Sequence, residues 1–170
     1  MYEFDTPAPV RLRIEIHSGD VTIEATATDT TTVLLEEGHG NGASELVEQT
    51  IVEQRGDDII VEAPRRSSTF FGRTPSMDVV VRVPHDSTVD VRVNSGDLQT
   101  TGRFAAAKVK SGSGDVQIGI AEGVPAWLDV HSLTGSVSSA LGASEPPAEG
   151  EPSVSVHANT VTGDISLFRA

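Results

Sequence analysis

Cysteine is absent from the 170 residues. Its absence excludes disulfides, thiolate zinc sites and cysteine catalysis together. Long apolar runs are absent too, since no stretch approaches the roughly 18 residues that a membrane-spanning helix requires. Residues 1–10 hold Glu3, Asp5 and two prolines where a secretory signal would have a basic start and an apolar run. We therefore predict a cytoplasmic protein with no membrane insertion.

Basic and aromatic residues are scarce. Lys and Arg together number 12 against 25 Asp and Glu, which gives a formal net charge of −13, and aromatic residues make up only 4%. An acidic surface repels phosphate backbones, so we expect no nucleic-acid partner. The content of 16 Gly and 9 Pro is typical of a globular β protein with many turns rather than of a disordered chain.

Apolar residues recur at every second position in short runs, which is the spacing of half-buried strands. β-branched residues dominate these runs, as they do on pleated surfaces. The pattern predicts an all-β fold. The expected inward-facing sets are Ile14 and Ile16; Val21, Ile23 and Ala25; Met77, Val79, Val81 and Val83; Val89, Val91 and Val93; Val116, Ile118 and Ile120; Leu128 and Val130; Val154 and Val156; and Ile165 and Leu167.

The first half of the chain carries two other signals. Ser44 is expected to cap a short helix over 44–49. Residues 51–54 and 59–63 flank a turn rich in Gly and Asp and are expected to form an antiparallel hairpin. We predict a single domain over 1–170, with a hairpin-containing part over 1–90 and a repeated part over 91–170.

A corner motif of the form apolar-polar-Ser-Gly-Asp-apolar occurs five times with variation. From Gly96 to Gly114 is 18 residues and from Gly114 to Gly135 is 21, which fits one coil of a β-solenoid. Glycine permits a positive φ at a corner, and Asp can hydrogen-bond the backbone of the turn. The next interval contains a loop at 142–152, rich in Pro and Glu. The sequence thus predicts a short, β-helix-like solenoid, with the helix at 44–49 and Leu167 and Phe168 as end caps. The five corner glycines are Gly19, Gly96, Gly114, Gly135 and Gly163.

These corners resemble those of the bacterial β-strand repeat family labelled putative adhesin, a domain of unknown function. The same resemblance extends to residues 4–9, to the helix and hairpin ending at Pro64, to 123–130 and to 160–170, and so covers nearly the whole chain. It implies a β-helix-like fold and an adhesin-like binding role. It offers no catalytic motif to carry over.

The corners also raise two metal hypotheses. A solenoid would align Asp20, Asp97, Asp115 and Asp164, whose oxygens suit calcium, although turn formation explains these residues without a metal. His131 and His157 precede corners at similar positions, and stacking on adjacent rungs would let them share zinc or copper. Two ligands fall short of the three or four that a zinc site needs. We expect no cofactor and no metal, and the calcium alternative stays open.

The loop at 64–75 is unusual for an acidic, aromatic-poor chain. Arginine and aromatic side chains are enriched in binding hot spots, so we predict that this loop contacts a partner. The alternative is that the two phenylalanines cover the end of the sheet while the arginines pair with nearby acids. The predicted contact residues are Arg65, Arg66, Phe70, Phe71 and Arg73.

No catalytic constellation can be placed. The phosphate-binding loop, His-Glu-x-x-His and Gly-x-Ser-x-Gly motifs are absent. We therefore predict a non-catalytic scaffold, not an enzyme, that presents loops to a protein or polymer partner. Two alternatives stay open. One is a self-assembling scaffold or filament, a homo-oligomer formed by end-to-end stacking, and the other is a carbohydrate-active or carbohydrate-binding β-helix protein.

Overall fold

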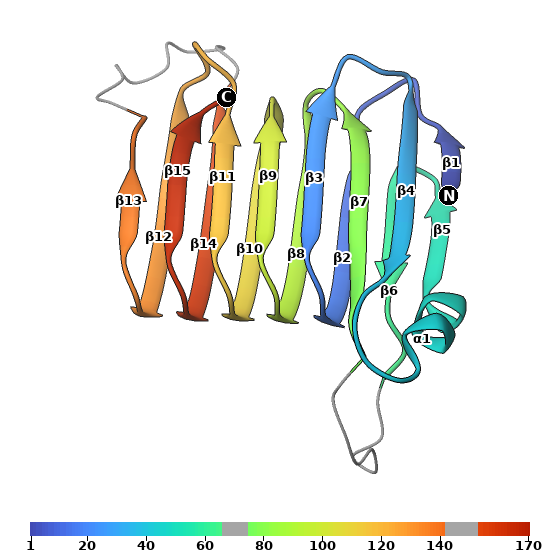
Figure 1. Ribbon diagram of the computed structural model, residues 1–170. Coiled ribbons are helices and arrows are strands. Elements are labelled where there is room, and N and C mark those ends of the chain that lie inside the picture. Colours follow the sequence, from blue (N-terminus) through green and yellow to red (C-terminus); the bar gives the residue numbers. More distant parts are fainter. Residues whose placement is uncertain (66–74, 142–152) are drawn as a thin grey trace.

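The computed structural model describes residues 1–65, 75–141 and 153–170 as two β-sheets that face each other (Figure 1). The order of the eight-stranded sheet is β1-β4-β7-β3-β9-β11-β15-β13, and that of the seven-stranded sheet is β12-β14-β10-β8-β2-β6-β5. The core fills the space between the sheets. The chain is an all-β, short β-solenoid with antiparallel strands near its N-terminus and one short helix, as the sequence predicts.

The bounds of the elements are as follows. The eight-stranded sheet consists of β1 (Tyr2–Asp5), β4 (Thr30–Glu37), β7 (Met77–Pro84), β3 (Val21–Thr26), β9 (Leu98–Gly102), β11 (Val116–Ile120), β15 (Ile165–Arg169) and β13 (Val137–Ser139). The seven-stranded sheet consists of β12 (Ala126–Thr134), β14 (Val154–Thr162), β10 (Phe104–Ser113), β8 (Ser87–Ser95), β2 (Arg11–Ser18), β6 (Asp58–Glu62) and β5 (Ile51–Arg55).

Each rung of the solenoid is one strand of the seven-stranded sheet, a glycine corner, and one strand of the eight-stranded sheet. The five rungs are β2–β3, β8–β9, β10–β11, β12–β13 and β14–β15. Strands of neighbouring rungs pair in parallel in both sheets. Strands β6 and β7 continue the parallel pairing beyond β2 and β3, but residues 63–76 join them in place of a short corner.

The order of rungs in space differs from their order in the chain. The β14–β15 rung lies between β10–β11 and β12–β13, so the penultimate rung in sequence forms the end of the stack. The prediction that Leu167 and Phe168 cap an end is therefore wrong, because both lie on β15, with a strand on each side, and Leu167 is only 2% exposed.

The opposite end of the stack is antiparallel and carries the helix. Strand β4 pairs antiparallel with β7, β1 with β4, and β5 with β6. Helix α1 (Ala43–Gln49) joins β4 to β5 and buries Ala43 and Leu46. The predicted hairpin and helix are thus confirmed, but the helix cap is Gly42, with φ of 91°, and not Ser44.

In the described part of the chain no helix has the length and apolar character to cross a membrane.

The predicted alternation of inward residues is confirmed along the inner rungs. Ile14, Val91, Val109 and Ala158 lie in register on adjacent strands, and each is fully buried. Burying one such aliphatic side chain stabilises the fold by about 1.5–3 kcal/mol. Leu128 and Val130 are the exceptions among the predicted inward residues, because both lie on the end rung, where Leu128 is 43% exposed and Val130 is half-buried.

The corners need glycine for a steric reason as well as for backbone freedom. Gly96 has φ of 144°, and a Cβ built there would lie 1.9 Å from the carbonyl oxygen of Gly19 on the neighbouring rung. The corners at Gly114, Gly163 and Gly135 repeat this contact with the rung before them in the stack. Any side chain would therefore push neighbouring rungs apart.

The aspartates that follow these glycines form a continuous ladder. The Oδ1 atom of Asp20 accepts a hydrogen bond from the backbone N–H of Asp97, and Asp97 accepts from Asp115 in the same way, both at 2.9 Å. Asp115 then accepts from Asp164, and Asp164 from Ser136, at the end rung. At the other end, Asp78 on β7 accepts from Asp20. At each corner an aspartate carboxylate thus accepts the hydrogen bond of a backbone N–H that has no carbonyl acceptor in the strand ladder.

We predict that Gly96→Ala destabilises the protein by about 3 kcal/mol or more, through overpacking and an unfavourable φ. The control is Gly56→Ala, because Gly56 also has a positive φ but has no atom within 4 Å of a built Cβ. The control should cost only about 1–2 kcal/mol. Urea unfolding of both variants measures the difference, and equal losses would show that close rung contact does not require the glycine.

Candidate functional site

The outer face of the seven-stranded sheet gathers basic side chains. We call Arg11, Arg13, Arg92, Lys108 and Lys110 the basic face; they come from β2, β8 and β10 and all are exposed. Their neighbours in inward positions are buried, so strand alternation turns each of them to solvent. The basic face brings together five of the 12 Lys and Arg residues of the chain.

Strand register places these charges in two rows across the rungs. In one row Arg13 pairs with Asp90, and Asp90 with Lys108. In the other row Glu15 pairs with Arg92, and Arg92 with Lys110. The rows contain four of the five basic residues and only two acidic ones. The centre of this face is therefore locally positive on a chain whose net charge is −13.

The outer face of the other sheet has a different character. The residues Thr22, Gln99, Gln117, Ser166 and Ser138 follow one another in register across five of its strands, and all of them are uncharged. Elsewhere on this face Glu24 of β3 and Arg82 of β7 pair with each other at 3.2 Å, so this row and this pair bring no excess of positive charge.

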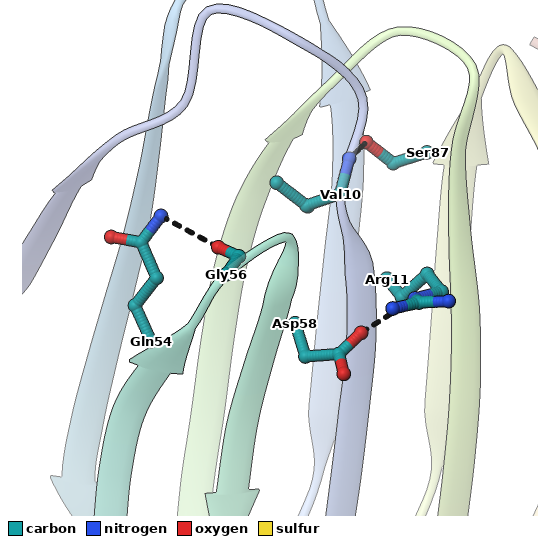
Figure 2. A network of polar contacts seen from close by, with 6 residues as sticks. All are labelled: Val10, Arg11, Gln54, Gly56, Asp58 and Ser87. Carbon is teal, nitrogen blue, oxygen red and sulfur yellow. Dashed lines mark hydrogen bonds and ion pairs between the residues drawn. The ribbon is translucent and has the colours of Figure 1, made fainter.

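Hydrogen bonds at the start of β2 fix one edge of the basic face (Figure 2). The Arg11 Nε atom lies 2.5 Å from Oδ1 of Asp58, on the neighbouring strand β6. Just before Arg11, the buried N–H of Val10 donates to the Ser87 hydroxyl at 3.0 Å. An exposed pair such as Arg11 and Asp58 adds little stability, so its main effect is to orient the guanidinium.

Two shallow depressions lie among these side chains. One, of 370 Å³, is lined by Arg11, Arg13, Asp58, Asp90 and neighbouring residues. The other, of 160 Å³, lies along Arg13, Glu15, Asp90 and Arg92. Among the described residues, no acid lies within 4 Å of the cationic ends of Arg13, Arg92, Lys108 or Lys110. Their charged hydrogen-bond donors are thus available to a ligand.

A smaller polar cluster lies on the end strand β12. Asp129 contacts His131 Nε2 at 2.6 Å and His157 Nδ1, on β14, at 3.3 Å. The two histidines lie on adjacent strands, but the hypothesis that they stack in register is wrong, because His157 lies beside Asp129 and His131 beside Asn159. Hydrogen bonds from His131, and then from His157, hold the pKa of Asp129 below its usual value of 3.8.

The structure places the other predicted site residues as follows. The corner aspartates do line up, and a groove of 240 Å³ runs along Asp20, Asp97 and Asp115. Their Oδ1 atoms already accept backbone amides, and no group of three or more potential ligands in the described segments has a geometry that would hold a metal ion. In the loop at 64–75, Arg65 is exposed, whereas Arg66, Phe70, Phe71 and Arg73 lie outside the described residues.

Reasoning from the sequence missed the basic face. Its signal is present in the alternation of Arg11 with Arg13 and of Lys108 with Lys110, which puts both members of each pair on one side of a strand. That β2, β8 and β10 are adjacent is a matter of topology, since β3 to β7 intervene in the sequence between β2 and β8.

Comparisons with known proteins agree with the architecture. A family model described as Toastrack DUF4097 matches residues 10–118. A solved structure of a putative cell adhesion protein from Clostridium sporogenes has 9% identity, covers 98% of this chain and 94% of that chain, and has a TM-score of 0.55. A putative adhesin from Bacteroides fragilis has 11% identity, covers 98% and 95%, and has a TM-score of 0.31. The Clostridium structure shares the fold of this chain. No curated protein matches the sequence significantly.

We predict that the carboxyl group of Asp129 titrates below the ordinary aspartate range, and that His131→Ala raises its pKa more than His157→Ala does. The stabilisation from a carboxylate with a lowered pKa is present above the unfolded pKa and is lost as the pH falls through the folded one. Carboxyl-detected NMR titration measures these values. His17→Ala, at a histidine of β2, is the control and should leave the titration of Asp129 unchanged. If neither histidine substitution changes the pKa of Asp129, the two histidines do not lower that pKa and the prediction is wrong.

Proposed function

The chain belongs to the Toastrack DUF4097 family, and we propose that it is a non-catalytic, adhesin-like scaffold whose basic face binds a negatively charged protein or polymer. The observation that supports this proposal is the concentration of Arg and Lys on three adjacent parallel strands of an acidic chain. The description of the Clostridium structure as a putative cell adhesion protein is consistent with a binding role.

Rigidity makes the basic face suitable for binding an extended partner. Parallel strands hold Arg92 and Lys110 one rung spacing apart, about 4.8 Å, and Arg13 lies on the adjacent strand β2, two residues off their row. The charges therefore need little ordering when a ligand arrives. An anionic chain that crosses the rungs would meet a cationic group on each of β2, β8 and β10. Guanidinium groups bind carboxylates and phosphates with two parallel hydrogen bonds, which favours such partners.

The chemistry available on this face is that of binding. Arg and Lys side chains on a flat sheet offer hydrogen bonds and charge, whereas catalysis requires a nucleophile or base positioned against a reacting atom. The depressions beside Arg11 and Arg13 are shallow and lie between side chains of a single layer. These features support a scaffold rather than an enzyme.

The loop at 64–75 remains part of the proposal. It follows β6 directly, and β6 contributes Asp58 and Ile60 to the depression beside Arg11 and Arg13. Arg65, at the start of the loop, is exposed. We propose that a partner on the basic face also contacts this loop beyond the end of β6, which would add specificity to an electrostatic surface.

We predict that Arg13→Gln with Arg92→Gln weakens binding of a fluorescent poly-L-glutamate or a sulfated polysaccharide by about tenfold or more. The loss of one charge-assisted hydrogen bond is worth about 1.5 kcal/mol, which is tenfold in affinity. The matched control is Arg82→Gln with Arg103→Gln, which changes the net charge equally but removes arginines paired with Glu24 and Asp86 elsewhere. Fluorescence anisotropy in low and physiological salt measures both variants.

Two results would contradict the proposal. Equal weakening by both double variants would mean that net charge alone, and not the basic face, governs binding. A wild-type protein that binds neither anionic polymer, even at low salt where charge attraction is least screened, would exclude the face as an anion-binding surface.

A further inference from the structure

We propose that two copies of the chain pair through β12, antiparallel and centred on Val130, to form a symmetric dimer. The partner is a second copy of this chain, and the surface is the end rung β12–β13, at the left of Figure 1.

The end rung presents side chains that are core residues elsewhere in the stack. Leu128 is 43% exposed, although Val156, its neighbour in register on β14, is only 1% exposed. In the other sheet Val137 is 46% exposed, while its neighbour Ile165 is fully buried. The end rung therefore has the inward pattern of an internal rung but the exposure of a surface.

Among residues 1–65, 75–141 and 153–170, the edge of β12 also lacks the usual protection against strand pairing. Edge strands are commonly blunted by lysine, proline or a covering element. Within its nine residues β12 has no Lys, Arg or Pro, and Asp129 is its only carboxylate. Its outward face carries Trp127 and Leu133, which are 61% and 80% exposed.

The sequence of β12 is complementary to itself in reverse. In an antiparallel pair centred on Val130, Asp129 lies opposite the partner's His131, and symmetry makes the same contact a second time. Trp127 lies opposite the partner's Leu133 on the outward face, and Leu128 opposite the partner's Ser132 on the inward face. Cross-strand apolar and opposite-charge pairs of this kind stabilise antiparallel strands. Each Asp129 carboxylate, which already contacts His131 of its own strand, thus also faces the partner's His131, although the chain as a whole is acidic.

The corner ladder decides between a dimer and a longer stack. A further parallel rung would need an acceptor for its corner amide, and Ser136 stands where the other corners have Asp. The Ser136 hydroxyl donates back to Asp164 Oδ1 at 3.1 Å, and its oxygen is one bond closer to the backbone than the aspartate Oδ1 that reaches the next rung elsewhere. The other end of the stack carries α1 and antiparallel strands, so it does not match β12–β13. An interface between two identical ends uses up both ends, so the assembly contains two copies and does not grow further.

Cysteine cross-linking tests the register, because the chain has no cysteine of its own. In the proposed dimer Val130 faces the partner's Val130, and opposed residues of paired strands lie within disulfide range. Val130→Cys should therefore give a covalent dimer when oxidised with copper phenanthroline. Leu133→Cys, on the same exposed strand, faces the partner's Trp127 and should stay uncross-linked. Equal cross-linking of both, or of neither, would overturn the register.

Light-scattering mass across protein concentration tests the surface. The wild type should reach twice 17.9 kDa and stop there. Leu133→Asp should raise the dimer dissociation constant by about tenfold or more, because symmetry applies each change twice. Ile51→Asp is the control, since Ile51 is an exposed apolar residue on β5, the edge strand at the other end. A monomer at all concentrations, growth beyond two copies, or equal sensitivity to Ile51→Asp would overturn the proposal.

Discussion

The hydrogen bond between a corner aspartate and the amide of the next rung is the constraint on which the rest of the structure depends. It joins neighbouring rungs at their corners, since Oδ1 of Asp20 accepts from the N–H of Asp97 where the glycine corners leave no room for a Cβ. Rungs held in that contact pair in parallel on both sheets and bury the alternating valines and isoleucines between them. Glycine supplies the close approach, and aspartate replaces the missing carbonyl.

The two faces and the two ends of this stack differ, and these differences suggest how the protein works. One face is positive at its centre, and the other carries a row of uncharged threonine, glutamine and serine across five of its strands. One end is covered by α1, and at the other the ladder stops at Ser136. A dimer through the β12–β13 end would join two seven-stranded sheets and lengthen the face that carries the basic residues.

Sequence periodicity predicts the strands, the hairpin, the helix and the glycine corners, because each depends on residues near one another in the chain. It does not predict that the β14–β15 rung lies between β10–β11 and β12–β13, because this order of rungs depends on stacking between residues far apart in the chain. The serine in place of aspartate at 136 marks the end rung, but its meaning follows only from the ladder. The basic face escapes sequence reasoning for the same reason: Arg13 and Arg92 are 79 positions apart and yet lie on adjacent strands.

Amide hydrogen exchange tests the corner ladder most directly. The account predicts that the amides of Asp20, Asp97, Asp115, Asp164 and Ser136 exchange slowly although these corners lie at the surface. In the Asp97→Ala variant the amide of Asp115 should exchange faster, because it loses its acceptor. The backbone amide at position 97 should still exchange slowly, because it keeps its bond to Asp20. Two results would contradict the account: wild-type corner amides that exchange as fast as the amides of open loops, or an exchange rate of the Asp115 amide that is unchanged in the Asp97→Ala variant.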